Sequence, residues 1–209
     1  MNVVLFGAGG TIGSRILSEV VSRGHGVTAV VRDASKIEPH ENTIATAGNI
    51  FDAASVADAA AGADAVVSAY GPGPENAGQL VEATRSLIRG VAASGVKRLI
   101  MVGGAGSLEV APGLMLKDAP NFPADWKAIA DAHTEALGVL RESGLEWTSV
   151  SPAAYIHPGA RTGKFRVGKD QLLTNESGGS EISAEDFAIA IADEVEHPAH
   201  VRERFTVAW

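Results

Sequence analysis

VVLFGAGGTIG, residues 3–13, joins a short apolar run to a glycine-rich turn with the spacing GxxGxxG. Residues 3–6 predict a buried strand, and residues 12–23 have the apolar period of a helix. In this order, strand, turn and helix form the pyrophosphate site of dinucleotide-binding folds, where free N–H groups at the helix N-terminus bind the anion. The predicted contacts are Gly7, Gly9, Gly10, Thr11, Ile12 and Gly13. A tight turn without a ligand is the alternative.

Each glycine of this turn has its own expected role. Gly7 permits the tight turn, Gly10 lets the backbone approach a diphosphate, and Gly13 allows the helix to pack closely on the strand.

The same alternation of strands and helices continues along the chain and predicts βαβ units around a parallel sheet. The predicted strands are residues 3–6, 27–31, 43–47, 65–69, 99–102, 148–150 and 205–207. The predicted helices are residues 12–23, 53–61, 79–94, 124–142 and 184–196. The sequence therefore predicts an α/β protein with a Rossmann-like, doubly wound parallel sheet, in a single NAD(P)-binding domain over residues 1–209.

The residues that flank the predicted helices agree with these boundaries. Asp52 is a plausible N-cap, and Ser183 with Asp186 resembles a capping box. Four glycines each follow a helix, as a left-handed stop would: Gly24, Gly62, Gly95 and Gly144.

The composition excludes several classes of function. The chain has 209 residues, of which 45% are apolar and 20% charged, and its formal net charge is −8. This acidic balance argues against nucleic acid and anionic membranes as partners. The absence of cysteine excludes disulfides and thiolate metal sites, and no metal site is predicted. No apolar run reaches the roughly 20 residues of a membrane helix, and no leader pattern is present, so we expect a cytoplasmic protein with a small-molecule substrate.

Two irregular segments break the alternation, and both follow the carboxyl end of a strand. Residues 109–123 hold three prolines, and residues 156–179 hold five glycines and one proline. Open α/β sheets bind their ligands at this edge. We therefore expect a substrate rim formed by segments 104–124 and 152–182.

Arg32 at the end of the second predicted strand points to the cofactor. It lies 19 residues after Gly13, about where such folds contact the adenosine ribose. A cationic fork suits a 2′-phosphate, which favours NADP over NAD. In the alternative, Asp33 binds the ribose, although Asp33 could instead cap the turn at residues 34–37. Asn49 and Ile50, after the third strand, are expected beside the adenine, with an ordinary turn between strand and helix as the alternative.

The chain lacks the Tyr-x-x-x-Lys pair with which many nicotinamide enzymes donate a proton. Its only tyrosines are Tyr70 and Tyr155, and the residues four positions later are proline and glycine. His133 could relay a proton near neutral pH, with an exposed surface histidine as the alternative. Ser107 lacks the glycine elbow of a nucleophile. Residues 103–106 are interpreted as backbone that makes room for a ring.

Several further motifs carry a family resemblance. They are VGGAGSL at 102–108, EWT at 146–148 leading to SPAA at 151–154, PGARTG at 158–163, ISAED at 182–186 and RFTV at 204–207. With these motifs the whole chain resembles the atypical short-chain dehydrogenases/reductases (SDRs) described as NADH-flavin reductases, relatives of NmrA-like proteins and flavin/biliverdin-IXβ reductase. The resemblance implies the strand order 3-2-1-4-5-6-7, an NAD(P)H site and the reduction of flavins or similar acceptors. Gly104 and Ala154 replace a serine and a histidine of the biliverdin reductase, which argues against tetrapyrrole reduction.

The resulting hypothesis is an NADPH-dependent oxidoreductase that transfers hydride to a flavin or a quinone-like acceptor, with flavin as a transient substrate. The residues expected around the nicotinamide are Ala69, Tyr70, Gly71, Gly103, Gly104 and Pro152. Those expected beside the acceptor are Tyr70, Ser107, His133 and Tyr155, of which His133 and Ser107 are the candidate catalytic groups. The alternatives are a non-enzymatic NAD(P) sensor of the NmrA-like type and, with less support, an NAD-dependent epimerase.

Overall fold

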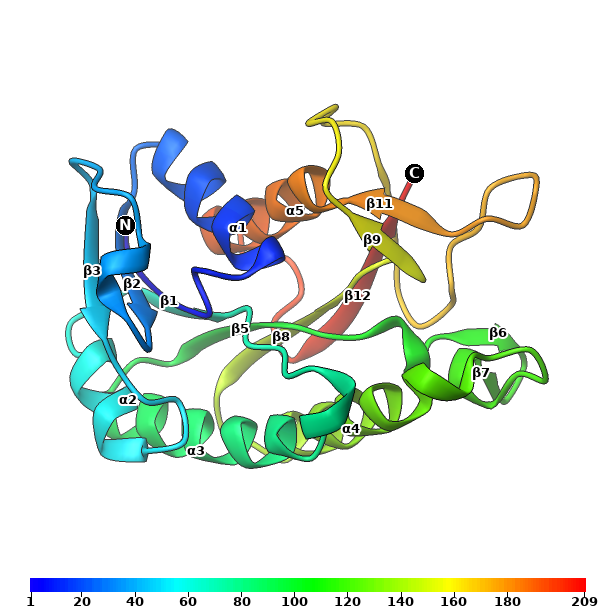
Figure 1. The fold of residues 1–209 in the computed structure, drawn as a ribbon, viewed down its shortest axis with the longest axis horizontal. Coiled ribbons are helices and arrows are strands. Elements are labelled where there is room, and N and C mark those ends of the chain that lie inside the picture. The colour runs from blue at the N-terminus through cyan, green and yellow to red at the C-terminus, as the bar shows by residue number, and fades with distance from the viewer.

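The computed structural model describes all of residues 1–209 and has the predicted α/β architecture (Figure 1). The main parallel strands are β1 (Asn2–Phe6), β2 (Gly26–Val31), β3 (Thr43–Ala47), β4 (Ala65–Ser68), β5 (Arg98–Val102), β8 (Glu146–Ser151) and β12 (Glu203–Ala208). The helices are α1 (Thr11–Ser22), α2 (Ala53–Ala60), α3 (Gln79–Ser94), α4 (Ala124–Arg141) and α5 (Ala184–Glu196).

The central sheet has the order β10-β12-β8-β5-β4-β1-β2-β3. Seven of these strands are parallel and follow the order that the family resemblance implies, 3-2-1-4-5-6-7. The eighth, β10 (Arg166–Gly168), pairs antiparallel with β12 at the edge and was not predicted. Three residues in a glycine-containing polar segment give too short a pattern to be recognised as a strand.

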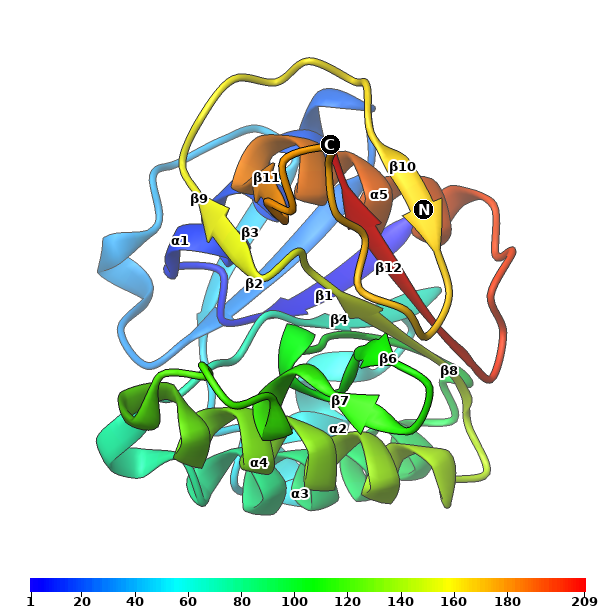
Figure 2. The same ribbon diagram turned by 90° about the vertical axis from the view of Figure 1, so that its right-hand side faces the viewer.

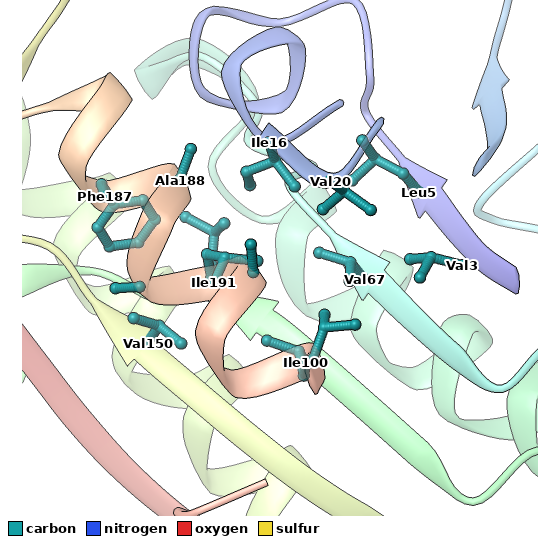
Figure 3. Close-up of a cluster of buried hydrophobic side chains, with 14 of the residues drawn as sticks. Val3, Leu5, Ile16, Val20, Val67, Ile100, Val150, Phe187, Ala188 and Ile191 are labelled. Atoms are coloured by element: carbon teal, nitrogen blue, oxygen red, sulfur yellow. The ribbon is translucent and has the colours of Figure 1, made fainter. Parts of the chain in front are cut away.

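Helices cover both faces of the sheet. α1 and α5 lie on one face, and α2, α3 and α4 lie on the other (Figure 1). Because successive strand residues point to opposite faces, Val3 and Leu5 of β1 enter the core beneath α1 and α5, while Val4 and Phe6 enter the other core. Figure 3 shows the first core, in which Ile16 and Val20 of α1 and Phe187 and Ile191 of α5 are packed.

Most of the predicted helix ends are confirmed. Asp52 accepts a hydrogen bond from the Ala54 N–H at 3.0 Å, and Ser183 accepts one from the Asp186 N–H at 3.0 Å. Gly24, Gly62 and Gly95 have positive φ, as expected of left-handed stops. The prediction for Gly144 was wrong, because its φ is not positive and α4 ends at Arg141 with Glu142 still in a helical conformation. The capping box is only half formed, since the Asp186 carboxylate accepts from Thr162, Gly163 and Trp209 instead.

The two predicted rim segments contain small sheets rather than irregular loops alone. Segment 104–124 holds the hairpin β6 (Glu109–Ala111) and β7 (Leu114–Met115), and segment 152–182 holds β9 (Tyr155–His157), which pairs with β11 (Glu181–Ser183). In Figure 2, β9 and β11 lie on the α1 and α5 side of the sheet, and β6 and β7 lie on the α4 side. No helix is both long enough and apolar enough to cross a membrane.

Candidate cofactor and acceptor site

A cavity of about 610 Å³ lies at the carboxyl ends of β1, β2, β3 and β4. Nine of the residues predicted to bind the cofactor line it: Gly7, Gly9, Gly10, Arg32, Asn49, Ile50, Ala69, Tyr70 and Gly71. The order of the strands reverses at β1, so the cavity occupies the switch point where open α/β sheets bind nucleotides.

The glycines of the first turn divide into two pairs. Gly7 has φ +81°, and a Cβ added there would lie 2.8 Å from the Ala69 carbonyl group; a Cβ on Gly13 would lie 2.0 Å from the Gly7 carbonyl oxygen. The fold itself therefore requires Gly7 and Gly13. At Gly9 and Gly10 the nearest atoms would be 3.9 and 3.4 Å away, so the protein's own packing leaves room for a side chain. The fold therefore does not itself require glycine at these two positions.

The N-terminus of α1 offers unpaired donors next to this turn. The backbone N–H groups of Thr11, Ile12 and Gly13 make no hydrogen bond to another protein group, and Gly10 at the N-cap has no side chain to satisfy them. The first turn of α1 also carries no acidic residue. Unpaired N–H groups and the helix dipole together favour a bound anion. Thr11, Ile12 and Gly13 do not line the cavity wall, so they would contribute through these N–H groups.

Two cations lie at the β2 end of the cavity. Arg32 lines the wall as predicted, and Lys36 of the 3₁₀ turn η1 (Ala34–Lys36) lines it too. Both side chains are exposed, and neither forms an ion pair within the protein. The Asp33 carboxylate accepts from the N–H and the hydroxyl of Ser35, at 3.2 and 2.7 Å, and these bonds lower the pKa of Asp33. Asp33 thus caps η1, which confirms the expectation that it caps the turn at residues 34–37.

The segments after β3 and β4 line the cavity with apolar and aromatic groups. Ile50 is buried, and the Asn49 side-chain oxygen accepts from the Phe51 N–H at 3.1 Å, which fixes this corner. Phe51 packs edge-on against Tyr70 with ring centroids 5.7 Å apart. Burial raises the pKa of Tyr70, so its phenol stays protonated and can donate to Gln79 at 3.3 Å. Sequence reasoning missed Lys36 and Phe51, because neither residue stands at a position that a motif marks.

The glycines after β5 serve a different purpose from the one predicted. A Cβ on Gly104 would lie 2.8 Å from the His133 ring, one on Gly103 would lie 2.8 Å from the Ser149 hydroxyl, and one on Gly106 would lie 2.6 Å from the Ala130 methyl group. The missing side chains therefore make room for the protein's own α4 and β8, not for a ligand ring. The backbone of Gly103 and Gly104 still lies at the carboxyl edge of the sheet, directly after β5.

His133 is neither an exposed surface residue nor a base for neutral pH. Its ring is partly buried against Gly104 and forms no hydrogen bond within the protein. Burial lowers the pKa of His133 to about 4, because the charged imidazolium is poorly solvated there. At neutral pH the ring is therefore uncharged, and the expectation of a proton relay that cycles near pH 7 is corrected.

The structure does not place Ser107 with the cofactor cavity. Ser107 is buried, and its hydroxyl and carbonyl oxygens accept from the Arg204 guanidinium at 2.8 and 3.2 Å. Arg204 also pairs with Asp170. The Ser107 side chain thus joins η3 (Ala105–Ser107) to β12, which gives its hydroxyl a structural contact.

Tyr155 and Pro152 lie on the β8 side of the carboxyl edge. Pro152 is buried directly after β8, whereas the Tyr155 side chain is 62% exposed on β9. The Tyr155 ring stacks on His157 with centroids 4.9 Å apart, and His157 in turn meets Trp209 edge-on. Tyr155 therefore presents one free aromatic face at the predicted rim.

With this geometry in place, comparison with known proteins defines the class. Residues 7–198 match the family described as NAD(P)H-binding, and the chain belongs to that family.

Three solved structures are similar over the whole chain. One from Burkholderia pseudomallei, named as a candidate exported protein, is 48% identical with a TM-score of 0.92 and covers 100% of both chains. One from Bacteroides thetaiotaomicron, named as a candidate epimerase, is 40% identical with a TM-score of 0.94 and covers 100% of this chain and 96% of its own. One from Streptococcus pneumoniae, named as a candidate NADH-flavin reductase, is 34% identical with a TM-score of 0.88 and covers 100% of this chain and 99% of its own. These relatives confirm the Rossmann-like fold and agree with the resemblance to atypical SDRs.

Proposed function

We propose that the protein is an NADPH-dependent reductase that transfers a hydride to a flavin or a quinone-like acceptor. The observation that carries the proposal is the cavity at the β1 switch point. The glycine turn of residues 7–13, the free N–H groups of α1 and two unpaired cations lie at this cavity. The backbone turn and the N–H groups match the diphosphate of NADPH, and the two cations match its 2′-phosphate.

The preference for NADPH over NADH is supported by the charges around the ribose position. Arg32 and Lys36 lack carboxylate partners, whereas the one carboxylate that lines the cavity, Asp33, is held by Ser35. An acidic residue free to accept from the ribose hydroxyls would favour NADH. Here a dianionic phosphate gains two cations instead.

The chain's own groups at the reacting end favour an acceptor that needs no dedicated acid. Bound dihydronicotinamide supplies the hydride. The protein orients the two partners and keeps a neutral His133 at the end of β5, and it has no Tyr-x-x-x-Lys pair. A reduced flavin or quinone can take its proton from water, so the lack of a Tyr-x-x-x-Lys pair and the neutral His133 are compatible with this reaction but unfavourable for reduction of a simple ketone.

NADPH oxidation by the purified protein tests the proposal. We expect the absorbance at the dihydronicotinamide band to fall faster than in buffer when riboflavin, FMN or menadione is added, and Arg32→Glu to slow the reaction at limiting NADPH. Bound NADPH without turnover of any of these acceptors would contradict a reductase and favour a nucleotide sensor.

The name of the Bacteroides relative gives a second candidate, an epimerase. An epimerase returns the hydride to its substrate and shows no net oxidation of its nucleotide. Stoichiometric consumption of NADPH by an added acceptor therefore separates the two candidates, and we expect consumption.

A further inference from the structure

The first turn of α4 carries an aromatic side chain that the fold leaves uncovered. Trp126 is 57% exposed, whereas Trp147 is 4% exposed and the indole N–H of Trp209 donates to Asp186 at 2.8 Å. Trp126 has no aromatic partner in the protein. More than half of this large apolar ring is in contact with water, so its position on the helix decides what it can bind.

The direction of Trp126 follows from its neighbours on α4. Ile129 packs with Tyr70 against the small apolar cluster next to η2 (Pro74–Asn76), while Ala130 and His133 pack against Gly106 and Gly104 after β5. At about 100° per residue, Trp126 projects between the directions of Ile129 and Ala130, and about 20° from that of His133. It therefore faces the same side of α4 as His133, about 10 Å nearer the helix N-terminus.

This direction places Trp126 on the side of α4 that packs on η2 and η3. On one side lies η2, which α4 contacts; Asn76 of η2 and Gly73, which directly precedes η2, border the cofactor cavity. On the other side lies η3, which follows the backbone of Gly103 and Gly104. In Figure 2, α4 runs beneath the sheet. Because the chain passes through α4 from β5 to the parallel strand β8, the N-terminal end of α4 is the end nearer the carboxyl edge of the sheet.

We propose that Trp126 is the aromatic surface on which the acceptor's planar ring stacks, and that it thereby selects flat conjugated acceptors. The inference rests on the proposed reductase function and adds the residue that recognises the acceptor. An exposed indole supplies a large rigid face, and stacking with a conjugated ring gains dispersion and desolvation energy without any charged group.

Two measurements on the whole protein test this role. The first is quenching of tryptophan fluorescence by menadione in the presence of saturating NADP⁺, which permits no turnover. We expect saturable quenching of the wild type that Trp126→Phe largely removes, and that the matched control Trp209→Phe retains. The second is steady-state kinetics, in which Trp126→Ala should raise the KM for menadione and riboflavin about tenfold with the Kd for NADPH unchanged, whereas Trp126→Phe should stay within about threefold of the wild type.

The outcomes separate this inference from the proposed function. Quenching that persists in Trp126→Phe, or an acceptor KM in Trp126→Ala that matches the wild type, would overturn the role of Trp126 while turnover upholds the reductase. If the wild type binds NADPH but none of the acceptors causes its oxidation, the reductase is contradicted. The fluorescence titration then still decides whether Trp126 contacts the acceptor. Saturable quenching that requires Trp126 would then support the contact, and absence of quenching would overturn it.

Discussion

The cofactor cavity and the acceptor side of the carboxyl edge are built in different ways. The cavity is formed mainly by short segments that directly follow β1, β2, β3 and β4, and its glycine turn and cations stand at positions fixed by local sequence. The acceptor side is formed where segments distant in sequence meet, such as Gly104 with His133 and Ser107 with Arg204. Local motifs therefore identify the cofactor half, whereas only the packed structure shows which groups remain free on the acceptor half.

The largest expected effect is on nucleotide binding by the glycine turn of residues 7–13. Gly10 has an extended conformation that any residue can adopt, and a Cβ there meets no atom closer than 3.4 Å. We expect Gly10→Val to fold with a melting temperature within a few degrees of the wild type, but to weaken NADPH binding by at least about 100-fold (~3 kcal/mol) because its methyl groups occupy the phosphate position. Calorimetric titration and thermal melts measure the two quantities.

The matched control for this variant is Gly144→Val, because Gly144 also has free space around it and no positive φ. It should bind NADPH as the wild type does. Equal binding by Gly10→Val would mean that the first turn does not hold the diphosphate.

The next effect concerns the cations at the ribose. Arg32→Glu should weaken NADPH binding by about 1.5 to 3 kcal/mol, the range for a hydrogen bond to a charged group, and leave NADH nearly unchanged. Parallel titrations with the two nucleotides provide the comparison. An equal loss for both would show that Arg32 does not contact the 2′-phosphate.

His133 gives a stability effect on the acceptor half that depends on pH. Its pKa is lowered to about 4 in the folded protein, against an ordinary value near 6.5, so the unfolded chain binds the extra proton first. The stability that the wild type gains by keeping His133 neutral is therefore fully present above about pH 6.5, and it is lost as the pH drops toward 4. Relative to His133→Gln, we expect the wild type to lose about 1 to 3 kcal/mol of unfolding free energy between pH 7 and pH 4. Parallel pH curves in denaturant titrations would contradict a buried neutral His133.

The smallest effect sharpens the account of the cavity. Lys36→Ala should lower NADPH affinity about fivefold (~1 kcal/mol), less than Arg32→Glu, because an exposed ammonium on a flexible chain is a weaker partner than a planar fork. NADH binding is the internal control. If the NADPH affinity does not change, Arg32 alone accounts for any preference.

The sequence predicted the fold and the cofactor cavity better than it predicted the acceptor side. Five helices and seven parallel strands were located, because long periodic segments carry their own signal. The edge strand β10 was missed because its pairing with β12 depends on contacts across the sheet.

The acceptor side could not be predicted in the same way. The tie between Ser107 and Arg204 joins residues 97 positions apart, and the burial that keeps His133 neutral depends on a glycine 29 residues earlier. Trp126 belongs to no motif. Its direction becomes clear only from the neighbouring residues of α4 that pack next to η2 and against η3.

Calorimetric titration of the purified wild-type protein with NADPH and NADH tests the central claim most directly. We predict one NADPH site per chain with a Kd of roughly 1 to 100 μM and at least about tenfold weaker binding of NADH. Absence of binding heat and of thermal stabilisation with either nucleotide would contradict the assignment of the β1 cavity as a cofactor site, and with it the proposed reductase.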